Sequence, residues 1–172
     1  MLPAPLPVPL LIAQHIGDDF GVVFADWLSD QSPHPARYAR HGENLLDTRG
    51  TVVLAPPGLH LRVEHDRLML DDSPPLHSCK PAIDHLFASI AASPHGHCTT
   101  ACLLTGMGRD GASGLRDILR AGGQTMAQDE TTCVIYGMPR EAVKLGAAQR
   151  VLPLLEIGNA LARMIHKTEG AR

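Results

Sequence analysis

Residues 101–114, ACLLTGMGRDGASG, join an apolar run to a glycine-rich turn. The apolar run Ala101–Leu104 predicts a buried strand, and residues 115–123, LRDILRAGG, have the apolar spacing of a helix. Strand, turn and helix in this order are the unit from which parallel α/β sheets are built. This stretch therefore predicts an α/β fold, and its turn is the first place to look for a functional site.

Two interpretations of the turn are open. Gly106, Gly108 and Gly111 have the G-x-G-x-x-G spacing of a dinucleotide-binding loop, and Asp129 stands where a ribose-binding carboxylate belongs. Against a nucleotide, Asp110 would bring a second negative charge to the pyrophosphate. In the other interpretation, the glycines allow a sharp turn that holds the Asp110 carboxylate in a rigid position.

The rest of the chain alternates strand and helix patterns. Strands are predicted at residues 10–13, 51–54, 99–105, 125–128 and 151–153, and helices at residues 20–28, 81–92, 111–121, 139–145 and 156–166. A small hairpin is predicted at residues 61–63 and 68–70, and a loop at Gln31–Arg37. This order predicts a doubly wound, mostly parallel sheet with helices on both faces. We expect one domain over residues 1–172, with a flexible tail from about Lys167.

Composition excludes several classes of protein. The 172 residues are 44% hydrophobic, which favours a globular domain over a disordered chain. The net charge of −3, without a strongly basic segment, argues against a nucleic-acid partner. No apolar run approaches the roughly 20 residues of a membrane-spanning helix. We therefore expect a cytoplasmic protein without membrane insertion.

The cysteine pattern does not predict a metal site. Cys79, Cys98, Cys102 and Cys133 contain no C-x-x-C pair, which a structural zinc site would typically show. We expect these cysteines to be reduced, and we expect no metal and no cofactor.

One histidine follows a predicted strand, at the sheet edge where Asp110 is also expected. His15 follows the strand at residues 10–13, with Gln14 between them. A His–Asp pair at that edge would orient the imidazole as a general base. Taken singly, His15 also fits a solvated loop histidine, and Asp110 also fits a residue that stabilises its own turn.

Five motifs in the same order extend the pattern over residues 10–164. They are IAQHIGDDF (12–20), APPGLHL (55–61), KPAIDHLF (80–87), LLTGMGRDGASGL (103–115) and AQDETTCVIYGMPREA (127–142). Together they resemble the catalytic domain of the bacterial chemotaxis protein-glutamate methylesterases (CheB-type). The resemblance implies an α/β serine hydrolase that cleaves methyl esters of glutamates on the cytoplasmic helices of chemoreceptors. Some family members also deamidate receptor glutamines, and many carry an upstream receiver domain.

The resemblance also assigns roles to residues. His15 matches the base of a Ser–His–Asp triad, and Asp110 matches the carboxylate that orients it. Met107 matches the residue whose backbone N–H binds the oxyanion, with Gly108 in the same active-site loop. The family needs no metal or organic cofactor. On this interpretation the glycines shape a triad loop, and Asp129 belongs to a motif on the active-site side.

The nucleophile is where this sequence departs from the family. The family serine lies in a G-x-S-T-G-G turn before the histidine, but only 14 residues precede His15 and none is serine. The serines present all fall outside a matching motif: Ser29, Ser32, Ser73, Ser78, Ser89, Ser93 and Ser113. We expect an N-terminally truncated methylesterase. The alternative is a homologue that binds receptors without hydrolysing them, and a more remote one is a dinucleotide-binding protein.

Overall fold

The structure is a computed structural model that describes the backbone of residues 2–169, and their side chains except those of residues 18, 19 and 166–169. It divides into two compact units, which we call the N-terminal unit (Pro3–Leu86) and the C-terminal unit (Phe87–Arg172, with residues 1–2). Each unit is described by itself.

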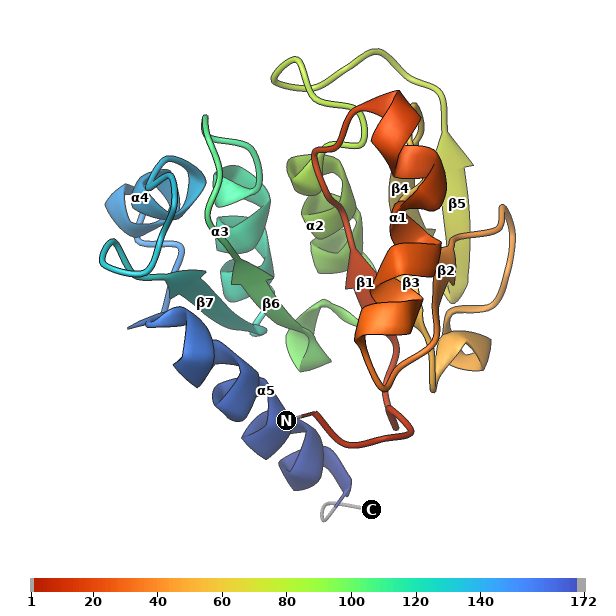
Figure 1. Cartoon of the computed structure of the whole chain (residues 1–172). Helices are drawn as coiled ribbons and strands as arrows, with labels where there is room; N and C mark the ends of the chain where they lie inside the picture. The colour runs from red at the N-terminus through yellow and green to blue at the C-terminus, as the bar shows by residue number, and fades with distance from the viewer. Residues whose placement is uncertain (1, 170–172) are drawn as a thin grey trace. The chain divides into compact units, whose positions relative to one another are not determined.

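The N-terminal unit contains a three-stranded parallel sheet in the order β1-β3-β2 (Figure 1). Its elements are β1 (Leu10–Ile12), α1 (Asp18–Gln31), β2 (Ala36–Tyr38), the short 3-10 helix η1 (Leu45–Thr48) and β3 (Val52–Leu54). The central strand β3 has the sequence VVL, and all three side chains are buried. A central strand is covered on both faces in a parallel sheet, so a continuous apolar run is the pattern it requires.

An antiparallel hairpin follows, formed by β4 (His60–Glu64) and β5 (Arg67–Asp71). His60 is buried and ties the hairpin to the segment before α2 (Ile83–Ala92). Its Nδ1 accepts a hydrogen bond from the backbone N–H of Ala82 at 3.1 Å, and its Nε2 lies 3.2 Å from the carbonyl oxygen of Pro74. This buried histidine thereby fixes residues 74–82, the segment that carries the cysteine described below.

The C-terminal unit repeats one strand–helix connection around a second parallel sheet, in the order β6-β7-β8. After the 3-10 helix η2 (Gly96–Cys98), its elements are β6 (Thr100–Leu103), α3 (Ala112–Arg120), β7 (Gln124–Gln128), α4 (Met138–Lys144), β8 (Arg150–Leu152) and α5 (Leu154–Glu169). In the central strand β7, the side chains of Met126 and Ala127 are fully buried, and in α3 those of Leu115 and Ile118 are. These apolar side chains form the core of the unit.

The predicted fold class is confirmed: mostly parallel sheets are flanked by helices, with one small antiparallel pair. One strand was missed, because β2 lies where a loop was predicted at Gln31–Arg37. Its three residues, Ala-Arg-Tyr after a proline, are too few to show a strand period. The predicted tail from Lys167 is helical up to Glu169, and residues 170–172 lie outside the described residues. Within the described part of the chain, no helix is long and apolar enough to cross a membrane.

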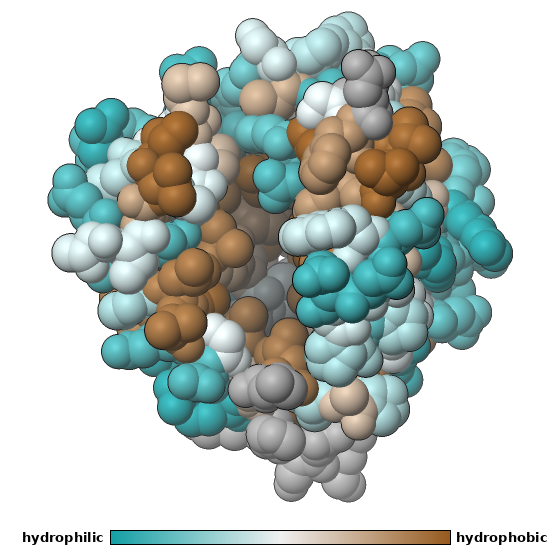
Figure 2. All heavy atoms as spheres, viewed as in Figure 1, coloured by the Kyte–Doolittle hydropathy of each residue, from teal (hydrophilic) through white to brown (hydrophobic). Residues whose placement is uncertain are grey.

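Helix α1 carries aromatic side chains on a face that solvent reaches. Phe24 lies between Phe20 and Trp27, with ring centroids 6.0 and 5.7 Å apart. Phe20 is 55% exposed and Trp27 is 50% exposed, whereas Gly21 and Ala25 on the other face are buried. Figure 2 shows hydrophobic residues gathered over this helix. The helical period of residues 20–28 was therefore predicted correctly, but the period alone did not show which face is buried.

We expect the C-terminal core to be sensitive to truncation of Leu115 on α3. Leu115→Ala removes a fully buried side chain and should lower the free energy of unfolding by about 2–5 kcal/mol, because the cavity cannot collapse completely. Leu155→Ala is the matched control on α5, since Leu155 is 87% exposed, and it should stay within about 0.5 kcal/mol of the parent. Urea denaturation measures both. Equal losses would contradict the assignment of this core.

Cys102 on β6 should be the least reactive thiol of the folded chain. Burial raises the pKa of Cys102 to about 12, so this thiol stays protonated near pH 8. We expect iodoacetamide to label the exposed Cys98 promptly and Cys102 only after unfolding in urea. Mass spectrometry of the labelled peptides gives the rates. Labelling of Cys102 as fast as Cys98 in the folded chain would contradict this prediction.

Candidate active-site loops

Asp110 lies in the loop between β6 and α3, directly before the helix. Its side chain is 1% exposed, and its Oδ1 accepts a hydrogen bond from the backbone N–H of Gly111 at 3.0 Å. Gly108 has a φ of +92° and Gly111 has a φ of +83°, conformations that residues with a Cβ rarely adopt. The glycines thus make the sharp turn that the sequence predicted, and Asp110 is a buried, hydrogen-bonded carboxyl.

A second loop, between β7 and α4, is hydrogen-bonded to the first through Gly106. The backbone N–H of Gly106 donates to the carbonyl oxygen of Ile135 at 3.0 Å, and the carbonyl oxygen of Gly106 accepts from Met138 N–H at 2.8 Å. A Cβ on Gly137 would lie 2.5 Å from that same carbonyl oxygen. Only glycine lets the two backbones approach this closely, so residues 135–138 fix the start of the Asp110 loop.

The buried side chain of Gln128, at the end of β7, joins the same two loops. Its Oε1 accepts from the Thr105 backbone N–H at 2.8 Å, and its Nε2 donates to the Thr132 carbonyl oxygen at 2.7 Å. The Thr105 hydroxyl in turn donates to the Ile135 carbonyl oxygen at 3.0 Å and lies 2.8 Å from the Ile135 N–H. Sequence reasoning missed Gln128 and Thr105. The available signal was a polar residue at the end of each buried strand.

Asp129 serves its own loop. Its carboxylate accepts hydrogen bonds from the hydroxyl groups of Thr131 and Thr132, and these bonds lower the pKa of Asp129. The hydrogen-bonding capacity of this carboxylate is therefore directed at residues 131–132, which does not favour the ribose-binding role considered for it.

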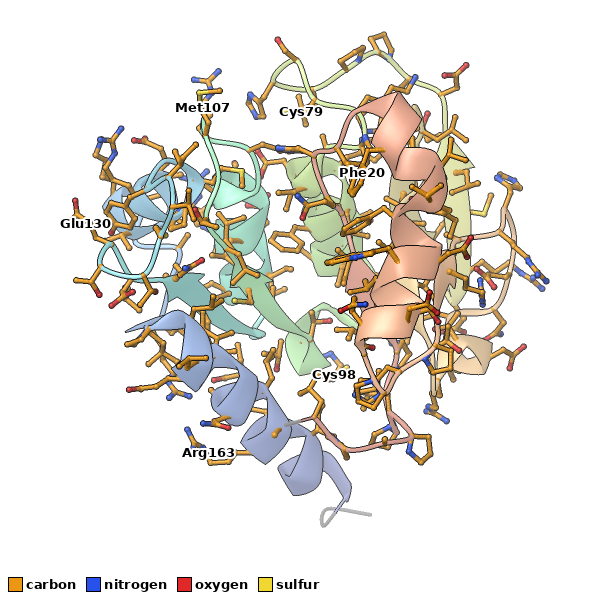
Figure 3. The ribbon with its side chains drawn as sticks, in the orientation of Figure 1. Phe20, Cys79, Cys98, Met107, Glu130 and Arg163 are labelled. Carbon is orange, nitrogen blue, oxygen red and sulfur yellow. The ribbon has the colours of Figure 1, made fainter. Side chains whose placement is uncertain are left out.

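Three large apolar side chains of these loops are exposed, among exposed charged and polar ones. Met107 is 78% exposed, and Figure 3 shows it at the outer end of the β6–α3 loop. Val134 and Ile135 on the neighbouring loop are exposed as well. Solvated apolar side chains on a hydrogen-bonded platform are suited to contact with another protein surface.

His15 lies in the N-terminal unit, three residues after the end of β1. Its Nδ1 is 3.8 Å from the Sγ of Cys79, a residue 64 positions later in the chain. Cys79 closes a tight turn with Leu76: the N–H of each donates to the carbonyl oxygen of the other, at 2.9 and 3.1 Å. His15 thus has a thiol neighbour that the sequence analysis did not predict.

The predicted site residues fall in different units. His15 belongs to the N-terminal unit, whereas Asp110, Met107 and Gly108 share one loop of the C-terminal unit. The last three are neighbours in the sequence, and their roles stay predictions. The pairing of His15 with Asp110 stays a prediction.

The contact between the two loops should make Gly137 intolerant of a side chain. In Gly137→Ala the new methyl group would meet the Gly106 carbonyl oxygen, and we expect a loss of about 1–3 kcal/mol in the free energy of unfolding. Gly158→Ala on α5 is the control, because nothing lies within 4 Å of its Cβ and alanine favours a helix by up to about 1 kcal/mol. Thermal denaturation of both variants tests this, and a neutral Gly137→Ala would contradict it.

Comparison with known proteins gives a consistent result. Residues 1–161 match the family model of the CheB methylesterases. A protein-glutamate methylesterase/protein-glutamine glutaminase 2 of Anaeromyxobacter dehalogenans is 47% identical over 163 residues, which are 95% of this chain and 47% of that protein. The protein-glutamate methylesterase FrzG of Myxococcus xanthus is 45% identical over 166 residues, 96% of this chain and 49% of that protein. The chain thus spans about half the length of these curated relatives.

The fold agrees with a solved structure. The crystal structure of the Thermotoga maritima CheB methylesterase catalytic domain superimposes with a TM-score of 0.83 at 31% identity, covering 96% of this chain and 86% of that domain. The resemblance carried by the five motifs is confirmed, and the chain belongs to the CheB methylesterase family.

Proposed function

We propose that this chain is the catalytic part of a protein-glutamate methylesterase, a carboxylic ester hydrolase of bacterial chemotaxis. The observation that carries the proposal is the family match over residues 1–161, with His15 and Asp110 standing in the motifs of the triad base and its carboxylate. Its substrates would be methylated glutamates on the cytoplasmic helices of chemoreceptors, which places the protein in the cytoplasm. Deamidation of receptor glutamines is a second proposed activity, in keeping with the name of the Anaeromyxobacter relative.

The proposed reaction is an acyl transfer through the serine of a G-x-S-T-G-G turn, which residues 1–172 do not contain and which the proposal requires from codons before Met1. His15 takes the proton of the serine hydroxyl as its oxygen attacks the ester carbonyl, and Asp110 holds the imidazole in the required tautomer. The backbone N–H of Met107 stabilises the oxyanion. Methanol leaves with the proton from His15, and water then hydrolyses the acyl-enzyme to restore the glutamate carboxylate.

The loop geometry suits the proposed role of Asp110. Gly111 N–H donates a hydrogen bond to Oδ1 of Asp110 at 3.0 Å and holds the side chain in place, and in the proposed reaction this carboxylate stabilises the imidazolium of His15. The connections through Gly106 and Gln128 restrict movement of the loop that carries it. A rigid loop matters because oxyanion and triad groups must hold their positions to a fraction of an ångström.

The test uses the protein expressed from its whole open reading frame, with any in-frame codons before Met1. In that protein we expect His15→Ala to abolish hydrolysis. Methanol release from a methylated receptor peptide should fall by about 10⁴-fold or more, and Asp110→Asn should cause a loss of similar size. His97→Ala, which changes an exposed histidine after α2, should keep the parent rate. If methanol release survives His15→Ala, the triad assignment is wrong.

A second candidate is a receptor-binding homologue without hydrolase activity, since none of the serines in residues 1–172 stands in a G-x-S-T-G-G turn. The same assay separates the two. Two results together would favour a protein that only binds receptors. The first is that the parent protein binds the methylated peptide and releases no methanol, and the second is that the codons before Met1 encode no G-x-S-T-G-G turn. Methanol release that depends on His15 would exclude it.

A further inference from the structure

We propose that Cys79 and His15 form a binding site for a thiophilic divalent cation, with Zn²⁺ as the representative ion. Both residues belong to the N-terminal unit, and the proposed hydrolysis gives no role to Cys79. The site would therefore place a metal ion on the histidine that the family motif assigns to catalysis.

The distance between the two ligand atoms fits such an ion. A zinc ion binds cysteine sulfur at about 2.3 Å and histidine nitrogen at about 2.0–2.1 Å, and at a tetrahedral angle these bonds place the ligand atoms about 3.6 Å apart. The Sγ of Cys79 and the Nδ1 of His15 are 3.8 Å apart. An ion could bridge them after a shift of a few tenths of an ångström. Thiolate and imidazole are also the two side chains that zinc prefers.

The turn that carries Cys79 is fixed before any ion binds. Leu76 and Cys79 exchange two backbone hydrogen bonds, and His77 and Ser78 between them have φ values of +54° and +63°. The Nε2 of His77 lies 3.0 Å from an oxygen of Asp84, a buried residue at the start of α2. Two non-glycine residues with positive φ are costly, and these contacts hold them in place. A preset turn lowers the entropic cost of ligand binding.

Binding would be an exchange of a proton for the ion. Cys79 loses its thiol proton to solvent, Sγ and Nδ1 each form one bond to Zn²⁺, and water completes the coordination. An imidazole held by a cation at Nδ1 cannot be oriented by a carboxylate through that atom. The inhibition of hydrolysis that this predicts rests on the proposed function, whereas the binding site itself does not.

Cobalt titration of the chain tests the site, because a cobalt thiolate absorbs in the near ultraviolet and reports the sulfur ligand directly. We expect a thiolate band that saturates at one ion per chain and is displaced by Zn²⁺. Cys79→Ser should abolish the band. Loss of a residue that only orients a metal ligand weakens binding by roughly 10–100-fold. His15→Gln removes a direct ligand, so it should weaken cobalt binding by more than that.

Cys98→Ser is the matched control, since Cys98 is exposed and lies in a segment with His95 and His97. It should leave the band unchanged. A band that survives Cys79→Ser, or one that disappears in Cys98→Ser, would overturn the proposal, as would the absence of any thiolate band in the parent.

A measurement on the unmodified chain covers the case in which a variant does not fold. Long-range ¹H–¹⁵N spectra resolve the ring nitrogens of each histidine. Addition of Zn²⁺ should shift the Nδ1 signal of His15 ahead of those of the other histidines. An unchanged His15 ring at saturating Zn²⁺ would overturn the site, and it would do so without bearing on whether the protein hydrolyses methyl esters.

Discussion

The hydrogen bonds that the buried amide of Gln128 makes to Thr105 and Thr132 are the constraint on which the two candidate active-site loops of the C-terminal unit depend. One side chain satisfies a backbone donor on the first loop and a backbone acceptor on the second. Replacing it with an apolar group would remove both hydrogen bonds between the loops. The loop that carries Asp110 begins at Thr105, so these bonds fix its first residue.

Glycines also hold the two loops together, through their backbone rather than through a side chain. Gly106 and Gly137 allow two backbones to come within hydrogen-bond distance, and Gly108 and Gly111 then reverse the chain with positive φ. The G-x-G-x-x-G spacing that resembles a nucleotide loop is here divided between two tasks. Gly106 serves contact with the neighbouring loop, and the other two serve the turn around Asp110. This division explains how the spacing of a phosphate-binding loop can occur in a hydrolase family.

The sequence predicted what is local and missed what is distant. The β6–turn–α3 unit, the hairpin and the buried β3 each leave a periodic pattern or a turn signal within about ten residues, and each was predicted. The contact between His15 and Cys79 joins residues 64 positions apart, and no periodicity reports such a contact. The positive φ of His77 and Ser78 was equally hidden, because neither residue type requires it. Gln128 was assigned to a strand, but its role depends on two loops whose closeness only folding creates.

His15 in its proposed role illustrates why a histidine that acts as a base is exposed to competing ligands. In the proposed triad, Nε2 of His15 takes the serine proton and Nδ1 is directed at Asp110, and either imidazole nitrogen can bind a transition metal when it carries no proton. A thiol 3.8 Å from that ring adds a second ligand atom, so affinity for a soft cation increases at the residue where a bound cation would interfere most. Serine in place of Cys79 would keep a hydrogen-bonding group beside the imidazole and remove most of this affinity. Cysteine or serine at position 79 would thus decide how strongly a metal ion binds beside His15, although the proposed reaction gives this side chain no other role.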